Sequence, residues 1–311
     1  MSIAFLFPGQ GAQYKGMGKE LYDNFSEAKA IFEMADASLP FSIKEVCFED
    51  SKNVINETKY TQPAILTASI AALKVLEKEN IKAAFCAGLS LGEYSALVAS
   101  GVLDIGAAVP LVYNRGTFME EAVPTGQGAM AAIMGLDNSV VEEVCDAASS
   151  KGVVQPANYN YNGQIVIGGE TLAVQYAMSL AKDKGAKRAI PLNVSGPFHT
   201  SLLQDAAQKL ESHMIDISFQ PWNTSIVSNV TALPYNQLSL LKETLVKQVI
   251  SPVKWEQSIQ YMISQGVTHF VEIGPGKTLC GFLKRIDKSV KALNVEDIKS
   301  LENTIKTIGG Q

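Results

Sequence analysis

The sequence is poor in residues that bind metals or form disulfides. Its 311 residues include four cysteines and three histidines. No two cysteines form a C-x-x-C pair, and no histidine stands at metal-ligand spacing. Reduced thiols, no metal and no cofactor are therefore expected, as is typical of a cytoplasmic protein.

Dense positive charge and long apolar runs are also missing. Lys and Arg number 26 against 31 Asp and Glu, a net charge of −5, which argues against a nucleic-acid partner. No stretch approaches the 18 apolar residues of a membrane span. The apolar run at 3–7 has no basic region before it, so we expect a strand there rather than a signal peptide. A cytoplasmic monomer without membrane contact is expected.

What is present is an ordinary globular composition, 47% hydrophobic and 18% charged. Outside 126–197, strand and helix patterns alternate, which predicts a largely parallel sheet wrapped by helices. The length allows one large domain or a core with an inserted module.

One stretch organises the rest of the chain. A short apolar run at 83–87 predicts a buried strand, Gly88-Leu89-Ser90-Leu91-Gly92 follows, and 93–100 reads as a helix. Strand, G-x-S-x-G and helix together indicate a nucleophile elbow with Ser90 at its tip. Side chains at Gly88 and Gly92 would collide across so sharp a turn. The alternative is a serine in a glycine-bounded loop.

A glycine-rich loop, 8–13, follows the first strand. G-x-G-x-x-G fails because Tyr14 replaces the third glycine, so this is no dinucleotide fingerprint. The loop either brings its backbone and Gln10 close to a ligand or only ends a strand. Later, Gly274 to Thr278 resembles a phosphate-binding loop, but Val271 stands where that motif needs glycine, and we reject it.

Helices are expected over 26–39 and 60–80, with Pro63 in the first turn of the second. A third begins after Asp104 and runs towards residue 122, and Pro110 marks a kink or a later start. Arg115 lies on this helix. It is either a surface cation or a charge that points at Ser90.

From Gly128 the pattern changes. Strands at 129–134, 153–157, 164–168 and 188–194 and helices at 138–149 and 171–184 give the order β-α-β-β-α-β, the split βαβ of ferredoxin-like modules. We expect a core domain of 1–125 and 198–311 and an inserted subdomain of 126–197. The remaining chain predicts strands at 226–228, 269–273 and 292–295 and helices at 205–215, 237–249, 252–265, 277–285 and 296–308.

A nucleophilic serine needs a base. Among the histidines, His199 lies on a loop after the insert, whereas His213 falls in an amphipathic helix and His269 opens an apolar strand. His199 is therefore the candidate base. The N–H groups of Leu91 and Gln10 are the expected oxyanion donors. No acid between Ser90 and His199 sits in an obvious triad motif, so a carbonyl would orient the imidazole.

Several motifs together resemble malonyl-CoA:acyl-carrier-protein transacylase, the acyltransferase of type II fatty acid synthesis. They occur in the family's order across nearly the whole chain. They are Phe7 to Gln13, Gly88 to Tyr94, Arg115-Gly116, Asn158 to Asn160, Pro197-Phe198-His199 and Glu272 to Gly276. The resemblance implies an α/β-hydrolase-like core with a ferredoxin-like insert.

The resemblance also implies residue roles. Ser90 carries the malonyl ester, His199 is the base, and Arg115 pairs with the free carboxylate of malonate. Gln10 and Leu91 form the oxyanion hole. The main-chain carbonyl of Gln248 orients His199. The resemblance also implies that Phe198, Asn158 and Asn160 line the cleft. One departure is Leu89, because the family usually has histidine there.

The implied reaction moves malonyl from malonyl-CoA to the phosphopantetheine thiol of an acyl carrier protein. Because such carriers are acidic, we expect a basic patch at 182–188 or 284–288. The alternatives are a malonyltransferase of a polyketide pathway, a serine thioesterase or hydrolase of related fold, and a carrier-binding module without catalysis.

Overall fold

A computed structural model describes residues 1–124, 126–194 and 196–309. Within them lies a five-stranded parallel sheet of order β7-β2-β1-β8-β9. Its strands are β1 (Ile3–Phe7), β2 (Phe85–Gly88), β7 (Ser225–Val227), β8 (His269–Ile273) and β9 (Lys291–Val295). All five carboxyl ends share one edge of this sheet, where ligands of open parallel sheets bind.

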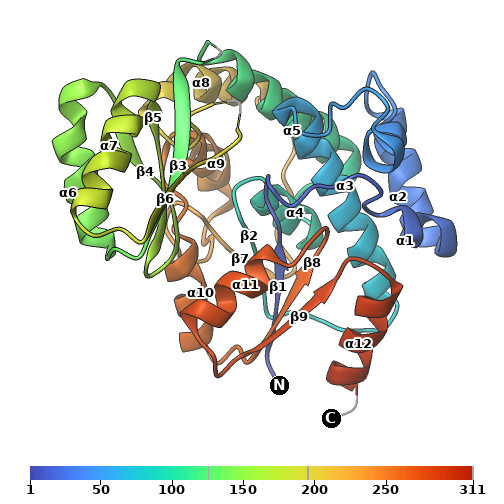
Figure 1. The fold of residues 1–311 in the computed structure, drawn as a ribbon. Coiled ribbons are helices and arrows are strands. Elements are labelled where there is room, and N and C mark those ends of the chain that lie inside the picture. Colours follow the sequence, from blue (N-terminus) through green and yellow to red (C-terminus); the bar gives the residue numbers. More distant parts are fainter. Residues whose placement is uncertain (125, 195, 310–311) are drawn as a thin grey trace.

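Helices cover both faces of the parallel sheet, as the apolar strands require. In β1 every residue is buried, with Phe5 and Phe7 in one core and Ala4 and Leu6 in another. The first core includes residues of α3 (Thr58–Glu77), α4 (Gly92–Ala99) and α12 (Ile298–Gly309). The second includes residues of α10 (Trp255–Ser264) and α11 (Thr278–Ile286), and Figure 1 shows α11 in front of the sheet.

Other helical elements precede these helices or lie between them in the chain. Apart from the two helices of the inserted segment, they are α1 (Lys19–Asn24), α2 (Ser26–Ala37), a π-helical turn η1 (Glu45–Glu49), α5 (Ile105–Glu121), η2 (Ser149–Lys151), η3 (Ser201–Leu203), α8 (Gln204–His213), η4 (Leu238–Leu240) and α9 (Leu241–Ile250). The Asp104 carboxylate accepts from the Gly106 N–H at 2.8 Å and so caps α5, as expected.

Several helix starts differ from expectation. α3 begins at Thr58, so Pro63 lies beyond its first turn, and α5 runs through Pro110 from its start at Ile105. α9 begins at Leu241, after a separate 3₁₀ turn. α10 begins three residues late because Val253 pairs with the antiparallel sheet: its N–H donates to the Ala157 carbonyl at 2.8 Å.

The segment after residue 126 folds as expected into β-α-β-β-α-β. Its antiparallel sheet has the order β4-β5-β3-β6. The elements are β3 (Gly128–Met134), α6 (Asn138–Ala148), β4 (Val154–Tyr161), β5 (Gln164–Glu170), α7 (Thr171–Asp183) and β6 (Arg188–Pro191). β4 is longer than expected because its residues as far as Tyr161 pair with β5, and β6 ends at Pro191, which has no N–H for the ladder.

The two faces of this antiparallel sheet have different partners. Along β3, Ala131 and Ile133 pack with residues of α6 and α7, whereas Met130 and Ala132 belong to the main core cluster. Figure 1 shows α6 and α7 on the outer side, away from the parallel sheet. The expected boundary loops include Thr125 and Ser195, which lie outside the described residues.

No helix in the described part of the chain is long and apolar enough to cross a membrane. Across 1–124, 126–194 and 196–309, no group of three His, Cys, Asp or Glu side chains could hold a metal ion.

Candidate active site

Ser90 stands on a strained turn between β2 and α4. Its φ is 52°, in the left-handed region that side chains rarely adopt. A Cβ added at Gly88 would lie 1.9 Å from the Gly92 carbonyl carbon, and one added at Gly92 would lie 2.1 Å from the Phe7 oxygen. Only glycine fits at these two positions, which confirms the steric reason for the G-x-S-x-G pattern.

Asn229 holds the Ser90 turn from the neighbouring strand. It follows β7, which pairs with β2. Its Oδ1 accepts from the Ser90 N–H at 2.7 Å, and its Nδ2 donates to the Gly88 carbonyl at 2.7 Å. One amide thus ties both sides of the turn.

His199 lies against the Ser90 hydroxyl. Its Nε2 is 2.7 Å from Ser90 Oγ, and its Nδ1 is 2.8 Å from the main-chain oxygen of Gln248. Because a carbonyl only accepts, Nδ1 carries the proton and Nε2 is left to accept from the hydroxyl. Burial, and next the nearby charge of Arg115, lower the pKa of His199 to about 4. The imidazole is therefore neutral at pH 7.

Arg115 is buried beside the serine. Its side chain is 1% exposed, so it is not a surface cation. Nη2 lies 3.3 Å from Ser90 Oγ and donates to Gln248 Oε1 at 2.9 Å, and Nη1 donates to Gln62 Oε1 at 2.8 Å. The guanidinium carbon lies 5.4 Å from the centre of the Tyr94 ring. In the described residues no carboxylate forms an ion pair with Arg115, and the hydrogen-bond partners named here are neutral. The buried Glu93 carboxyl acts on the guanidinium at longer range and favours its charge.

The two expected oxyanion donors lie on the elbow and on the loop after β1. In the part of the chain that the structure describes, neither the Leu91 N–H nor the Gln10 N–H has a hydrogen-bond acceptor. The Gln10 side chain is engaged instead, because its Nε2 donates to Thr58 Oγ1 at 3.0 Å. Gln10 lines the cleft at Ser90, whereas Leu91 is 1% exposed and is not among the lining residues.

A cleft of about 390 Å³ opens onto Ser90. It lies between the carboxyl edge of the parallel sheet and the antiparallel sheet. Among its lining residues are the predicted Gln10, Asn158, Asn160, Phe198 and His199. Apolar side chains from both sheets and α11 complete the walls, among them Leu89, Met130, Val166 and Phe282. Arg115 and Gln248 are not in the lining but lie behind the serine.

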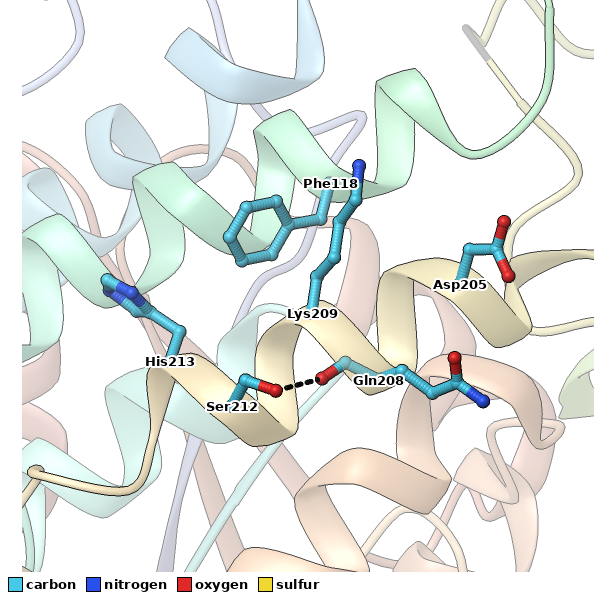
Figure 2. A pocket seen from close by; sticks show the side chains of 6 residues that line it. All are labelled: Phe118, Asp205, Gln208, Lys209, Ser212 and His213. Carbon is cyan, nitrogen blue, oxygen red and sulfur yellow. Dashed lines mark hydrogen bonds between the residues drawn. The ribbon is translucent and has the colours of Figure 1, made fainter.

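A larger hollow of about 580 Å³ lies on the surface between α5 and α8 (Figure 2). Its side chains already contact protein groups: Lys209 forms an ion pair with Glu121 at 3.0 Å, and His213 Nε2 is 3.1 Å from Asn114 Nδ2. Ser212 donates to the carbonyl of Gln208, as Figure 2 shows. In this hollow the Ser212 hydroxyl contacts a main-chain carbonyl and not a base that could activate it. The cleft at Ser90 is therefore the candidate active site.

The sequence prediction missed several buried polar residues of this site: Gln62, Glu93, Asn229 and Tyr235. In the sequence, Gln62 stands beside Pro63 near a helix start, with no pattern that points to the site. Glu93 offered a signal, because a charged residue directly after the elbow falls where α4 packs into the core. Asn229 and Tyr235 carry no local pattern.

Comparisons with known proteins identify the family of the chain. A model of the acyl transferase domain matches residues 4–308. The malonyl CoA-acyl carrier protein transacylase of Bacillus subtilis (strain 168) is 47% identical over 307 residues, 98% of this chain and 97% of that protein. The transacylase structure from Clostridium perfringens ATCC 13124 has a TM-score of 0.97 at 46% identity and covers 100% of this chain and 98% of that one.

A further solved structure is a malonyl-transacylase in complex with its type II PKS acyl-carrier protein. It has a TM-score of 0.96 at 38% identity and covers 99% of this chain and 100% of that one. The chain therefore belongs to the acyl transferase family, as its motifs predicted, and its relatives there are malonyl CoA-acyl carrier protein transacylases.

Proposed function

We propose that this protein transfers malonyl from malonyl-CoA to the phosphopantetheine thiol of an acyl carrier protein and so supplies extender units for fatty acid synthesis. The observation that carries the proposal is the buried Arg115 guanidinium 3.3 Å from the Ser90 hydroxyl, which forms no ion pair with a carboxylate among the described residues. A buried cation beside the nucleophile fits an acyl group that has its own carboxylate.

The first half-reaction acylates Ser90. His199 Nε2 takes the hydroxyl proton as Oγ attacks the thioester carbon. The N–H groups of Leu91 and Gln10 stabilise the oxyanion, and the Gln248 carbonyl stabilises the imidazolium through its Nδ1–H. When the C–S bond breaks, CoA leaves as its thiol with the proton from His199, and malonyl-Ser90 remains.

The second half-reaction reverses these roles. His199 takes the proton from the carrier's phosphopantetheine thiol, and the sulfur attacks the malonyl ester. The tetrahedral intermediate uses the same two donors. Its collapse returns the proton to Ser90 Oγ, and the free enzyme and malonyl-carrier are formed. Asn158, Asn160 and Phe198 line the cleft that the two thioesters would share.

The test of acylation is mass spectrometry of the intact protein after incubation with malonyl-CoA. We expect an adduct of malonyl mass on Ser90 that transfers to a holo carrier protein and is absent in Ser90→Ala. A wild-type protein that forms no adduct would contradict the proposal, as would an adduct that persists in Ser90→Ala. A carrier-binding module without catalysis would give the first result.

Arg115 separates this activity from that of a thioesterase or hydrolase, which needs Ser90 and His199 but no cation. We expect Arg115→Ala to lose malonyl transfer by roughly 10- to 100-fold, the worth of a charge-assisted hydrogen bond. The same variant keeps or gains activity on acetyl-CoA. Arg115→Lys keeps the charge without the planar guanidinium, so its rate of malonyl transfer should lie between those of the wild type and Arg115→Ala. Equal losses on both thioesters would favour the hydrolase alternative.

The pathway rests on the relatives. Their names place them in malonyl transfer to carrier proteins, and one was solved with a type II PKS carrier. We propose fatty acid synthesis here, with a polyketide pathway as the alternative. Parallel measurement of kcat/KM for the two kinds of carrier decides between them.

A further inference from the structure

Glu93 is a fully buried carboxylate that no step above uses. It lies in the first turn of α4, three residues after Ser90, and is 0% exposed. We infer that Glu93 is a positioning residue: it fixes the side-chain amide of Gln248 and, through Gln248, the arrangement of His199 and Arg115. The inference rests on the proposed function, because it concerns the speed of that acyl transfer.

The contacts of Glu93 are all with hydrogen-bond donors. Oε1 accepts from the Tyr235 hydroxyl at 2.6 Å, and Oε2 accepts from Gln248 Nε2 at 2.6 Å. The Asn229 N–H lies 3.3 Å from both oxygens. Burial raises the pKa of this carboxyl, and the three donors together with the charge of Arg115 oppose that rise. A buried carboxylate with this many donors is held in one place.

Gln248 links this carboxylate to the reacting groups. A glutamine amide can occupy its pocket in either of two orientations unless its hydrogen-bonding neighbours select one. Glu93 only accepts, so Nε2 faces it and Oε1 faces Arg115, from which it accepts at 2.9 Å. Nε2 also donates to the Ser90 carbonyl at 3.0 Å. The main-chain oxygen of the same residue receives the His199 Nδ1–H.

In this arrangement the acid, Glu93, contacts the residue that orients the base and does not contact the base itself. In a Ser-His-Asp triad the carboxylate contacts the imidazole directly and fixes its tautomer and orientation. Here the Gln248 carbonyl makes that contact, and Glu93 holds Gln248. The sequence prediction found no triad acid because the acid that serves this arrangement does not contact His199.

The experiment measures single-turnover acylation of Ser90 by malonyl-CoA in wild type, Glu93→Gln, Gln248→Met and the double variant. We expect Glu93→Gln to lower the acylation rate constant about 10²-fold, the usual cost of a misplaced catalytic group, with a much smaller change in the malonyl-CoA concentration for half-saturation. Methionine at 248 keeps the main-chain carbonyl and removes the amide. In the Gln248→Met background, adding Glu93→Gln should lower the acylation rate constant by less than about threefold more, because Glu93 can no longer act through the Gln248 amide.

The controls decide between positioning and general stability. Asp36→Asn makes the same chemical change at a carboxylate on α2 that accepts from the Ile43 and Lys44 N–H groups, far from Ser90, and should leave acylation unchanged. Losses that multiply in the double variant, or a Glu93→Gln rate equal to wild type, would overturn the inference.

If Glu93→Gln does not fold, Tyr235→Phe keeps the carboxylate and removes one of its donors. We expect about a fivefold loss, the worth of one hydrogen bond, which again vanishes in the Gln248→Met background. A loss that persists there overturns the inference. Absence of acylation in the wild type itself would instead contradict the proposed function and leave this comparison without a baseline.

Discussion

At the scale of single residues, the candidate site pairs its reacting groups with neutral partners. The base contacts a carbonyl rather than a carboxylate, and the guanidinium contacts two glutamine oxygens. These neutral acceptors orient the imidazole and the guanidinium without forming an ion pair with Arg115. The protonation state of His199 is therefore set by its burial and by Arg115, which both favour the neutral form.

This predicts an unusual pH profile for acylation. The pKa of His199 is lowered from 6.5 to about 4, so the base is active at any pH well above that value. The kcat/KM for malonyl-CoA should stay level as the pH falls from 8 through 6.5, and its acid limb should appear only below. Stopped-flow acylation across this range measures the midpoint. A midpoint at or above 6.5 would contradict the prediction.

The sequence located Ser90, His199 and Arg115 because each stands in a local motif or on a recognisable loop. The structure brings these three together, while their catalytic roles stay predictions. Gln62 and Asn229 were missed for a physical reason: their contacts with Arg115 and Ser90 join residues 53 and 139 positions apart. An amide that acts only through distant partners leaves no pattern in the sequence near it.

At the scale of elements, α11 depends on a buried carboxylate at its start. Glu272 on β8 is 0% exposed and accepts from the Leu279 N–H at 3.1 Å and the Cys280 N–H at 2.8 Å. These are first-turn donors that a helix leaves unpaired, and a carboxylate there stabilises the helix. Burial nevertheless raises the pKa of Glu272 to about 7.

This raised pKa predicts the direction of one stability change. Between about 4.5 and about 7 the folded state binds the Glu272 proton and the unfolded state does not, so the contribution of Glu272 falls as the pH rises. The full change is about 3 kcal/mol in the free energy of unfolding. His199 acts oppositely, since its contribution is lost as the pH falls from 6.5 towards 4.

Urea unfolding of wild type and Glu272→Gln at several pH values checks this. We expect the variant's stability, relative to wild type, to rise between pH 4.5 and 7 and then to level off. Parallel stability curves for the two proteins would show that Glu272 does not titrate in this window.

Element types were predicted well from hydrophobic pattern, whereas several boundaries were not. The order β-α-β-β-α-β and the strand and helix around Ser90 follow from local periodicity. The late start of α10 goes with the pairing of Asn158 with Val253, a contact across 95 positions of the chain. Such long-range pairing overrides local propensity.

At the scale of the whole molecule, the antiparallel sheet and α11 each contribute to one basic pocket. Lys187 and Arg188 line it together with Lys284, Arg285 and Lys288. Among the described residues none of the five has an ion-pair partner. The sequence named 182–188 and 284–288 as separate candidates for the basic patch, and only the fold brings them to one place. We propose that this pocket meets the acidic carrier.

Charge reversal tests the proposal. Lys284→Glu with Arg188→Glu should raise the KM for the carrier protein roughly tenfold at low salt and less at high salt, because the attraction is screened. Acylation by a malonyl thioester of N-acetylcysteamine, which has no phosphates and no carrier, should not change. Lys306→Glu, a reversal of an exposed lysine on α12 that has no ion pair among the described residues, is the control. An unchanged carrier KM in the double reversal would remove the pocket from the docking surface.

The Arg115 guanidinium forms no ion pair among the described residues, and this has a consequence for how the enzyme discriminates between acyl groups. Its charge weakens the base at 199 while the cleft is empty. In the proposed reaction a bound malonyl carboxylate would balance that charge, so the correct acyl group would also strengthen the imidazole that activates the serine. An acetyl group would do neither. We therefore propose that this one cation selects the acyl group twice, once when the thioester binds and again when the proton moves.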